Sequence, residues 1–286
     1  MAKYRIGVIA GDGIGPEVVA QGLRVLERLG STCGFDYELE HFPFGADHYL
    51  GTGELLPDSA IEQLRGLNAI FLGAIGDPRV PSGLLEREIL LKLRFQLDLY
   101  VNLRPIVLYS EHLCPLKDKR PEDVDFIFVR ENTEDVYAGI TGYLKKDTPD
   151  EVASAQMIFT RAGVDRALRY GFELARKRNK QNKLTVVNKS NAIRIQDIWE
   201  RAAAAIAPEF PEIKWEQAYV DATAMWMVKN PEWFDVVVTT NMFGDILSDL
   251  GAMIQGGLGL AASGNLHPGR VSMFEPIHGS APKYKG

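Results

Sequence analysis

The sequence predicts an α/β fold with a largely parallel central sheet. Short apolar runs that read as buried strands alternate with longer segments of helical periodicity, and this alternation continues along the chain. With 286 residues, of which 46% are hydrophobic, the chain is long enough for two domains or for one large α/β domain.

The first hundred residues begin with a strand at 4–10 and a helix at 16–29, which has Pro16 in its first turn. The segment 37–42 alternates between polar and apolar residues. A helix at 57–67, a buried strand at 69–73 and a long amphipathic helix at 84–97 follow.

The remaining elements continue the alternation. We expect an extended segment at 100–109, strands at 125–130, 183–187 and 234–240, helices at 161–177 and 193–207, and a further helix that contains Asp245. No internal repeat and no linker is visible, so a second lobe would have to be an insertion.

Composition excludes several classes of protein. The net charge of −6 is mild, which argues against nucleic acid or an anionic membrane as a partner. Cys33 and Cys114 are far apart and have no metal-ligand spacing, so neither a zinc site nor a disulfide scaffold is expected. Without an amino-terminal signal or a run of 18 apolar residues, we expect a cytoplasmic enzyme.

Three aspartates stand in apolar surroundings and predict a metal site. Asp245 and Asp249 are four residues apart, so a helix places them on one face. Like charges at this spacing are unfavourable unless a positive group lies between them, and Mg²⁺ is typically bound by one or two carboxylates. Asp221 precedes another apolar run and is the third candidate ligand. The alternative for the pair is two solvated acids on a helix surface.

The segment 11–17, Gly-Asp-Gly-Ile-Gly-Pro-Glu, follows a strand and opens a helix. Its glycine spacing does not match the dinucleotide-binding fingerprint, so the segment predicts a tight turn that needs glycine, in preference to a Rossmann site.

Charged and phenolic side chains follow the ends of several predicted elements. Arg94, Arg104 and Arg130 would suit an anionic pocket, because guanidinium groups bind carboxylates through two hydrogen bonds. Tyr137 and Lys189 lie just beyond strands, where α/β enzymes place their chemistry, and could carry protons. Taken singly, each arginine is more commonly part of a surface ion pair, and a solvated lysine and a half-buried tyrosine are the favoured readings of the other two residues.

Together these segments resemble the β-decarboxylating dehydrogenases, the family of the 3-isopropylmalate, isocitrate, homoisocitrate and tartrate/D-malate enzymes. The resemblance extends from Gly11 to Gly286 and is closest to the 3-isopropylmalate type. Its blocks, in the family's order, are 11–17, Leu-Leu-Lys-Leu-Arg (90–94), Asn-Leu-Arg-Pro (102–105), Arg-Glu-Asn-Thr-Glu (130–134), Asn-Lys-Ser-Asn (188–191), Tyr-Val-Asp-Ala (219–222), Asn-Met-Phe-Gly-Asp-Ile-Leu-Ser-Asp (241–249) and Glu-Pro-Ile-His-Gly-Ser-Ala-Pro-Lys-Tyr (275–284).

The resemblance implies the isopropylmalate dehydrogenase-like two-lobed fold, which has a mixed, mostly parallel sheet and is not a Rossmann fold. A cofactor-binding lobe would combine residues 1–98 and 252–286, and residues 99–251 would form the inserted lobe for substrate, metal and dimerisation. The family normally continues beyond the position of Gly286, so we expect a carboxy-terminally truncated chain with an incomplete first lobe.

The resemblance also implies a role for each candidate residue. Mg²⁺ or Mn²⁺ would be held by Asp221, Asp245 and Asp249, and the substrate carboxylates by Arg94, Arg104 and Arg130. Lys189 would help to remove the hydroxyl proton, and Tyr137 would protonate the enol carbon after CO₂ has left. Lys189 and Asp221, which also touches substrate, would reach in from the partner subunit, so a homodimer would be the minimal active unit.

The expected substrate is 3-isopropylmalate, which would yield 4-methyl-2-oxopentanoate in leucine biosynthesis. Leu90 and Leu91 match the leucine pair that contacts the isopropyl group, and Glu88 would repel a third carboxylate. Arg87 departs from the glutamate usual in that type. As alternative substrates, D-malate or tartrate ranks second and isocitrate third. Two other classes stay open: a non-catalytic regulatory subunit, and a phosphatase that uses the Asp-x-x-x-Asp pair.

The expected cofactor is NAD or NADP. By resemblance, the cofactor-binding residues are His278, Gly279, Ser280, Ala281, Pro282, Lys283 and Tyr284. NAD-dependent members usually have Asp after Ser-Ala-Pro, whereas Lys283 and Tyr284 resemble the pair that meets the 2′-phosphate in NADP-dependent isocitrate dehydrogenases. A cation and a phenol suit a phosphate, so we expect NADP to be used at least as well as NAD.

Overall fold

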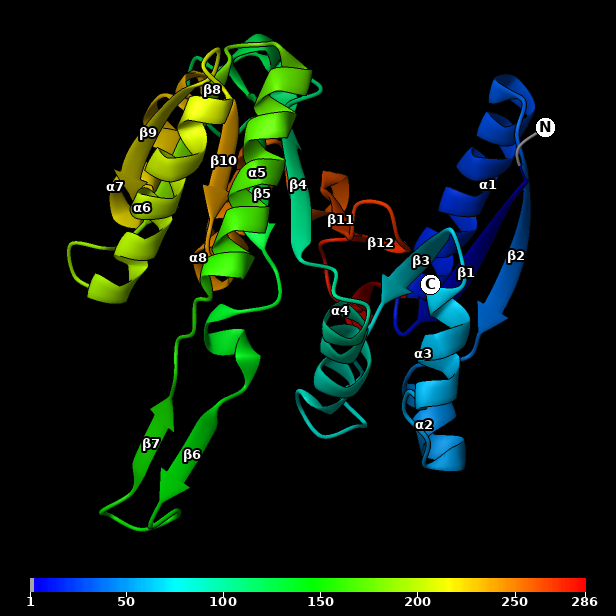
Figure 1. Cartoon of the computed structure of the whole chain (residues 1–286). Coiled ribbons are helices and arrows are strands. Elements are labelled where there is room, and N and C mark those ends of the chain that lie inside the picture. The colour runs from blue at the N-terminus through cyan, green and yellow to red at the C-terminus, as the bar shows by residue number, and fades with distance from the viewer. Residues whose placement is uncertain (1–2) are drawn as a thin grey trace. The chain divides into compact units, whose positions relative to one another are not determined.

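The computed structural model describes residues 3–286, which form two compact units (Figure 1). The first unit runs to Leu99 and resumes at Ala261, and the second comprises Tyr100–Leu260. From the sequence we placed the second boundary at 251/252. The structure keeps the end of α8 (Asn241–Ile254) and the segment after it with the second unit, because Ile254 belongs to that unit's core.

The first unit contains five strands of the main sheet, in the order β2-β1-β3-β12-β11. The β1–β2, β1–β3 and β3–β12 pairs are parallel, and β11–β12 is antiparallel. The elements are β1 (Lys3–Gly11), α1 (Gly15–Cys33), β2 (Asp36–Phe42), α2 (Ala46–Thr52), α3 (Asp58–Arg65), β3 (Ala69–Ala74), a π-helix (Glu86–Leu91), α4 (Lys92–Gln96), β11 (Ala262–Leu266), β12 (Ser272–Pro276) and a 3-10 turn (Pro282–Tyr284).

The second unit has its strands in the order β4-β5-β10-β8-β9. Among the neighbours in this order, β4–β5 is antiparallel, and β5–β10, β10–β8 and β8–β9 are parallel. The elements are β4 (Val101–Val107), β5 (Asp125–Glu131), a 3-10 turn (Asp135–Ala138), β6 (Thr141–Leu144), β7 (Val152–Ala155), α5 (Arg161–Arg178), β8 (Lys183–Asn188), α6 (Asp197–Ile206), β9 (Lys214–Tyr219), α7 (Val220–Lys229), β10 (Val236–Thr239) and α8; short 3-10 turns cover 111–113, 121–123, 194–196, 207–209, 231–233 and 258–260.

The predicted fold class, a mixed and mostly parallel sheet with helices, is confirmed. The central strand β10 is a run of β-branched residues that is completely buried, as expected for a parallel strand covered on both faces. Helix α5 begins at Thr160, whose hydroxyl accepts a hydrogen bond from the Gly163 amide, and it ends in three basic residues that suit the helix dipole.

Two details differ from the sequence-based expectation. The helix expected at 84–97 starts as the π-helix Glu86–Leu91 and becomes α-helical only in α4. The antiparallel hairpin β6–β7, which we call the arm, was not predicted, because its strands are short and it contributes nothing to the main sheet.

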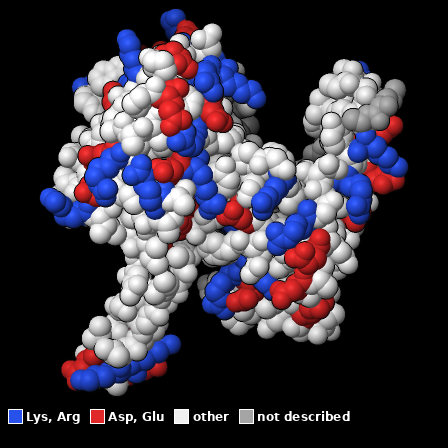
Figure 2. All heavy atoms as spheres, in the orientation of Figure 1, with Lys and Arg blue, Asp and Glu red and all other residues white. Residues whose placement is uncertain are grey.

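The arm projects from the second unit (Figure 1). Figure 2 shows charged side chains gathered at its tip, whereas its shaft is uncharged. Tyr143, Leu144 and Val152 on the arm have large apolar side chains that are exposed. Within residues 3–286, no helix is long and apolar enough to span a membrane.

Candidate active site

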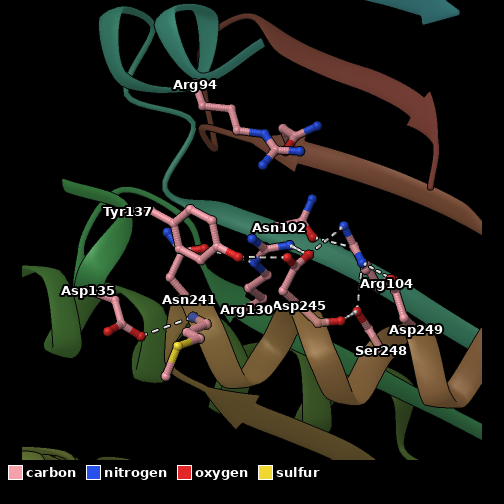
Figure 3. A network of polar contacts seen from close by, with 12 residues as sticks. Arg94, Asn102, Arg104, Arg130, Asp135, Tyr137, Asn241, Asp245, Ser248 and Asp249 are labelled. Carbon is pink, nitrogen blue, oxygen red and sulfur yellow. Dashed lines mark hydrogen bonds and ion pairs between the residues drawn. The ribbon is translucent and has the colours of Figure 1, made fainter. Parts of the chain in front are cut away.

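Helix α8 supplies one polar face to the candidate site in the second unit. It starts directly after the buried strand β10, and Asp245, Ser248 and Asp249 lie on one side of it because they are three and four residues apart (Figure 3). The side chains of Asp245 and Asp249 are 36% and 56% exposed. Both carboxylates can therefore be reached from solvent.

Arg104 on β4 is the positive group that the Asp245–Asp249 spacing requires. Its Nη1 donates to Asp249 Oδ1 at 3.0 Å and to Ser248 Oγ at 2.7 Å, and its Nη2 lies 3.5 Å from Asp245 Oδ1. Nε donates to Asn102 Oδ1 at 2.7 Å. The guanidinium is almost completely buried and is fixed from several sides.

Arg130, at the end of β5, is the second buried guanidinium of this group. Its Nη1 donates to Asp245 Oδ1 in a short contact, and its Nε donates to Asn241 Oδ1 at 2.9 Å. The structure thus brings Arg104 and Arg130 together at one carboxylate, as expected of an anion-binding pocket.

Tyr137 lies on the 3-10 turn after β5 and points toward α8 (Figure 3). Its hydroxyl donates to Asp245 Oδ2 at 2.8 Å, and the Arg130 guanidinium lies 5.5 Å from the centre of its ring. A weak acid therefore lies beside the Arg130 guanidinium and the Asp245 carboxylate, an arrangement suited to proton transfer at an anionic substrate.

Lys189 and Asp221 form a separate pair. Lys189 follows β8, Asp221 opens α7, and Lys189 Nζ lies 2.7 Å from Asp221 Oδ1. The Lys189 backbone amide is held by the side-chain oxygen of the buried Gln196 at 2.6 Å. Within one chain, Asp221 does not join Asp245 and Asp249.

A divalent cation is only partly accommodated by a single chain. Oxygen donors suit Mg²⁺, and Asp245 and Asp249 supply two carboxylates that solvent can reach. Over residues 3–286, however, no group of three or more His, Cys, Asp or Glu side chains could hold a metal ion. The donor chemistry of Asp245 and Asp249 fits such a cation.

The electrostatics of these carboxyl groups differ. Burial raises the pKa of Asp249, against the opposing effect of Arg104 beside it. The hydrogen bond from Lys189 lowers the pKa of the exposed Asp221. Asp221 is therefore the more readily ionised of the two, as suits a metal ligand near neutral pH.

In the first unit, Arg94 is held by a buried ion pair. Its Nη2 donates to Glu275 Oε1 on β12 at 3.0 Å, and Asn265 Nδ2 donates to the same oxygen at 2.7 Å. Leu90 and Leu91 precede it at the end of the π-helix, and both are half-buried. Leu90 packs against the unit's core, so it is held in place by neighbours.

The glycine-rich segment forms a tight turn, as predicted. Gly13 has φ 56°, and a Cβ there would lie 2.0 Å from the Ser280 carbonyl oxygen, so only glycine fits. Ile14 N donates to that same oxygen at 2.9 Å. The turn therefore holds the segment that we predicted to bind the cofactor.

That segment borders a hollow of about 350 Å³ in the first unit, lined by Gly76, Asp77, Glu86, Ser280 and Pro282 among others. Lys283 and Tyr284 are exposed, and Lys283 Nζ lies 4.8 Å from the Tyr284 ring centre. His278 and Gly279 precede the hollow, and Ala281 has φ 39°. The Lys283 ammonium group and the Tyr284 ring thus lie next to each other on the exposed surface.

Several site residues escaped the sequence analysis. Asn102 and Ser248 contact Arg104, Asn241 contacts Arg130, and Glu275 contacts Arg94. Periodicity could have found two of them: Asn102 is two residues from Arg104 on a strand, and Ser248 is three residues from Asp245 on a helix. Nothing local linked Glu275 to Arg94.

The profile of the family described as isocitrate/isopropylmalate dehydrogenase matches residues 5–286. The chain belongs to this family. It is therefore a β-decarboxylating dehydrogenase by class, and the resemblance stated from the sequence is confirmed.

Curated relatives support the assignment over nearly the whole chain. The 3-isopropylmalate dehydrogenase of Frankia casuarinae is 52% identical over 285 residues, which cover 99% of this chain and 81% of the relative. That of Thermobifida fusca is 49% identical over 99% of this chain and 80% of its own length.

Solved structures of the family have the same fold. An isocitrate dehydrogenase from Methylococcus capsulatus has a TM-score of 0.87 at 36% identity, covering 99% of this chain and 79% of its own. A β-decarboxylating dehydrogenase from Thermococcus kodakarensis has a TM-score of 0.77 at 32% identity, covering 99% and 77%.

Proposed function

We propose that this family member oxidises and decarboxylates 3-isopropylmalate to 4-methyl-2-oxopentanoate, a step of leucine biosynthesis, with NAD or NADP as hydride acceptor. The observation that carries the proposal is the contact of Tyr137 with Asp245 between Arg104 and Arg130. The identity of about half with curated 3-isopropylmalate dehydrogenases favours this substrate over isocitrate or D-malate.

The two buried arginines would bind the substrate carboxylates. Their hydrogen bonds to Asn102 and Asn241 fix the orientation of both guanidiniums. Because fixed donors need no reorganisation when the anion arrives, this arrangement favours binding and alignment of a dicarboxylate. Arg94, held by Glu275, would bind a carboxylate from the first unit.

Proton and electron transfer then follow from the chemistry of the substrate. A bound NAD or NADP would accept the hydride from C2, and Lys189 of the partner subunit would accept the hydroxyl proton. The bond from C3 to its carboxylate breaks, CO₂ leaves, and the electron pair forms an enolate. Tyr137 gives its proton to C3. A divalent cation held by Asp245 and Asp249 would withdraw electron density from the substrate and stabilise the enolate.

The complete site would be shared between two subunits of a homodimer. Asp245 and Asp249 would hold the cation together with Asp221 of the partner subunit, which would supply the missing third carboxylate. Helices α7 and α8 support a dimer because Met225, Val228, Ile246 and Met253 expose apolar side chains on them. The two cysteines, free of disulfides, agree with the cytoplasmic location that we propose.

The cofactor would lie at the hollow beside Ser280 and Pro282. Lys283 and Tyr284, exposed and side by side, would meet the 2′-phosphate of NADP. We therefore propose that NADP serves at least as well as NAD.

The test is a panel of 3-isopropylmalate, D-malate, tartrate and isocitrate with Mn²⁺ and either cofactor, followed by reduced-nicotinamide absorbance and CO₂ release. We expect the highest kcat/KM for 3-isopropylmalate. A higher kcat/KM for another diacid would identify that diacid as the substrate instead. No turnover with any of the four would favour a regulatory subunit. A strong preference for NAD would contradict the proposed role of Lys283.

A further inference from the structure

Asp135 is a buried carboxylate to which the mechanism above gives no role. Its side chain is completely buried in the second unit, on the same 3-10 turn as Tyr137. Its φ of 69° lies in the left-handed region, which costs free energy in a residue other than glycine. A buried ionisable residue with a strained backbone, so close to a proposed acid, suggests a functional constraint.

The Asp135 side chain joins the Tyr137 turn to helix α8. Oδ2 accepts a hydrogen bond from the Met242 amide in the first turn of α8 at 3.0 Å (Figure 3), and Oδ1 accepts from the Val136 amide at 2.8 Å. A carboxylate at a helix amino terminus is favoured by the free amides and by the helix dipole.

This contact replaces an ordinary helix cap. Thr240 occupies the N-cap position of α8, but its side chain makes no capping hydrogen bond, and its hydroxyl is buried without a partner in the structure. The helix that carries Asp245 and Asp249 is thus capped by the turn that carries Tyr137.

A second contact holds the same two elements together. Asn241 Nδ2 donates to the Glu134 carbonyl oxygen at 3.1 Å, while its Oδ1 accepts from Arg130. Asp135 itself is anchored on its other side, because its amide donates to the Ile158 carbonyl oxygen at 2.9 Å. The turn therefore has a defined position relative to α8.

We propose that Asp135 is a positioning residue, which holds the Tyr137 hydroxyl against Asp245 by capping α8. Tyr137 follows Asp135 by two residues, and Asp245 follows Met242 by three. The hydrogen bond between Asp135 and Met242 therefore lies within three residues of both partners of the Tyr137–Asp245 hydrogen bond. The inference rests on the proposed function, in which Tyr137 is the acid, but the structural link can be tested separately.

The test compares Asp135→Gly, Asp135→Asn and the control Asp235→Ala. Glycine accepts the left-handed backbone and removes both acceptors, whereas asparagine tolerates it and keeps one acceptor. Asp235 is equally buried in the same unit and accepts from Arg178 Nε and Gln181 N, so its loss reports on stability alone.

We expect Asp135→Gly to lower kcat about tenfold or more with little change in KM, and Asp135→Asn to lower it less. In a protein that already carries Tyr137→Phe, Asp135→Gly should cause no further loss of kcat. Equal losses of kcat in both backgrounds, or a similar loss in Asp235→Ala, would overturn the proposal.

Amide hydrogen exchange at Met242 tests the link without any assay of turnover. We expect faster exchange in Asp135→Gly and unchanged exchange in Asp235→Ala; unchanged exchange in Asp135→Gly contradicts the proposal. If the wild-type protein turns over no diacid, the proposed function fails, while the exchange data still decide whether Asp135 caps α8.

Discussion

At the scale of single residues, Glu131 illustrates how burial next to the site changes a carboxyl group. The residue follows Arg130 and is 1% exposed. Burial raises its pKa to about 7, although hydrogen bonds from Thr133 and from the Glu134 amide act in the opposite direction. The turn that leads to Tyr137 is thus anchored on a group that titrates near neutral pH.

This raised pKa predicts how stability depends on pH. The folded pKa of about 7 lies above the ordinary value of 4.5, so the folded state binds the proton more tightly. The contribution of Glu131 to stability is complete below pH 4.5 and is lost as pH rises toward 7, by at most about 1.4 kcal/mol per pH unit.

Replacing Glu131 by Gln removes the titrating group. Urea unfolding between pH 5 and pH 8 should show that wild type loses stability with rising pH more steeply than Glu131→Gln does. Parallel pH dependences of the two proteins would show that Glu131 titrates at its ordinary value.

At the scale of elements, α8 depends on a close approach to β5. Gly244 faces Arg130, and a Cβ at this position would lie 2.5 Å from Arg130 Cγ and 2.7 Å from its Cβ. The helix can therefore place Asp245 against the guanidinium only because the preceding residue has no side chain.

Gly244→Ala should displace Arg130 and raise the KM for the diacid about tenfold. Alanine is more favourable than glycine in a helix by about 1 kcal/mol, but overpacking typically costs about 1–3 kcal/mol. The free energy of unfolding should therefore fall. Gly259→Ala is the matched control, because a Cβ there meets nothing within 4 Å. Steady-state kinetics and thermal unfolding of both variants provide the measurement; an unchanged KM in Gly244→Ala would mean that Arg130 does not bind substrate.

At the scale of the whole molecule, the two groups of candidate residues are separate within one chain. Tyr137, the two arginines and the α8 carboxylates form one group, and Lys189 with Asp221 forms the other. Because Asp221 lies on α7, which also exposes the apolar Met225, a second copy bound at this face could bring the second group to the first.

Shared sites predict complementation between inactive variants. Lys189→Gln and Asp249→Asn should each be inactive alone, whereas co-refolded mixtures should recover roughly a quarter of wild-type activity, because half of the dimers then contain one intact site. Mixtures of Lys189→Gln with Asp221→Asn are the control and should stay inactive, since in the proposed dimer both residues would enter a site from the same subunit. Failure of the first mixture to recover activity, with dimers detected by light scattering, would place all the residues of a site in one chain.

Much of this protein follows from its sequence alone. Periodicity determined the alternation of strands and helices, and it put Asp245 and Asp249 on one face of α8, because such patterns depend only on the local geometry of the backbone. The motif blocks identified the family and its candidate residues, now matched by the family profile over residues 5–286.

Only the tertiary structure decided which of those residues meet. Strand order brings Arg104 from β4 to Asp249, although 145 positions separate them, and it leaves Asp221 paired with Lys189. It also showed Asp135 as the cap of α8, and the arm as a separate hairpin. Such contacts depend on how distant segments pair and pack, and no local pattern of residues encodes that pairing.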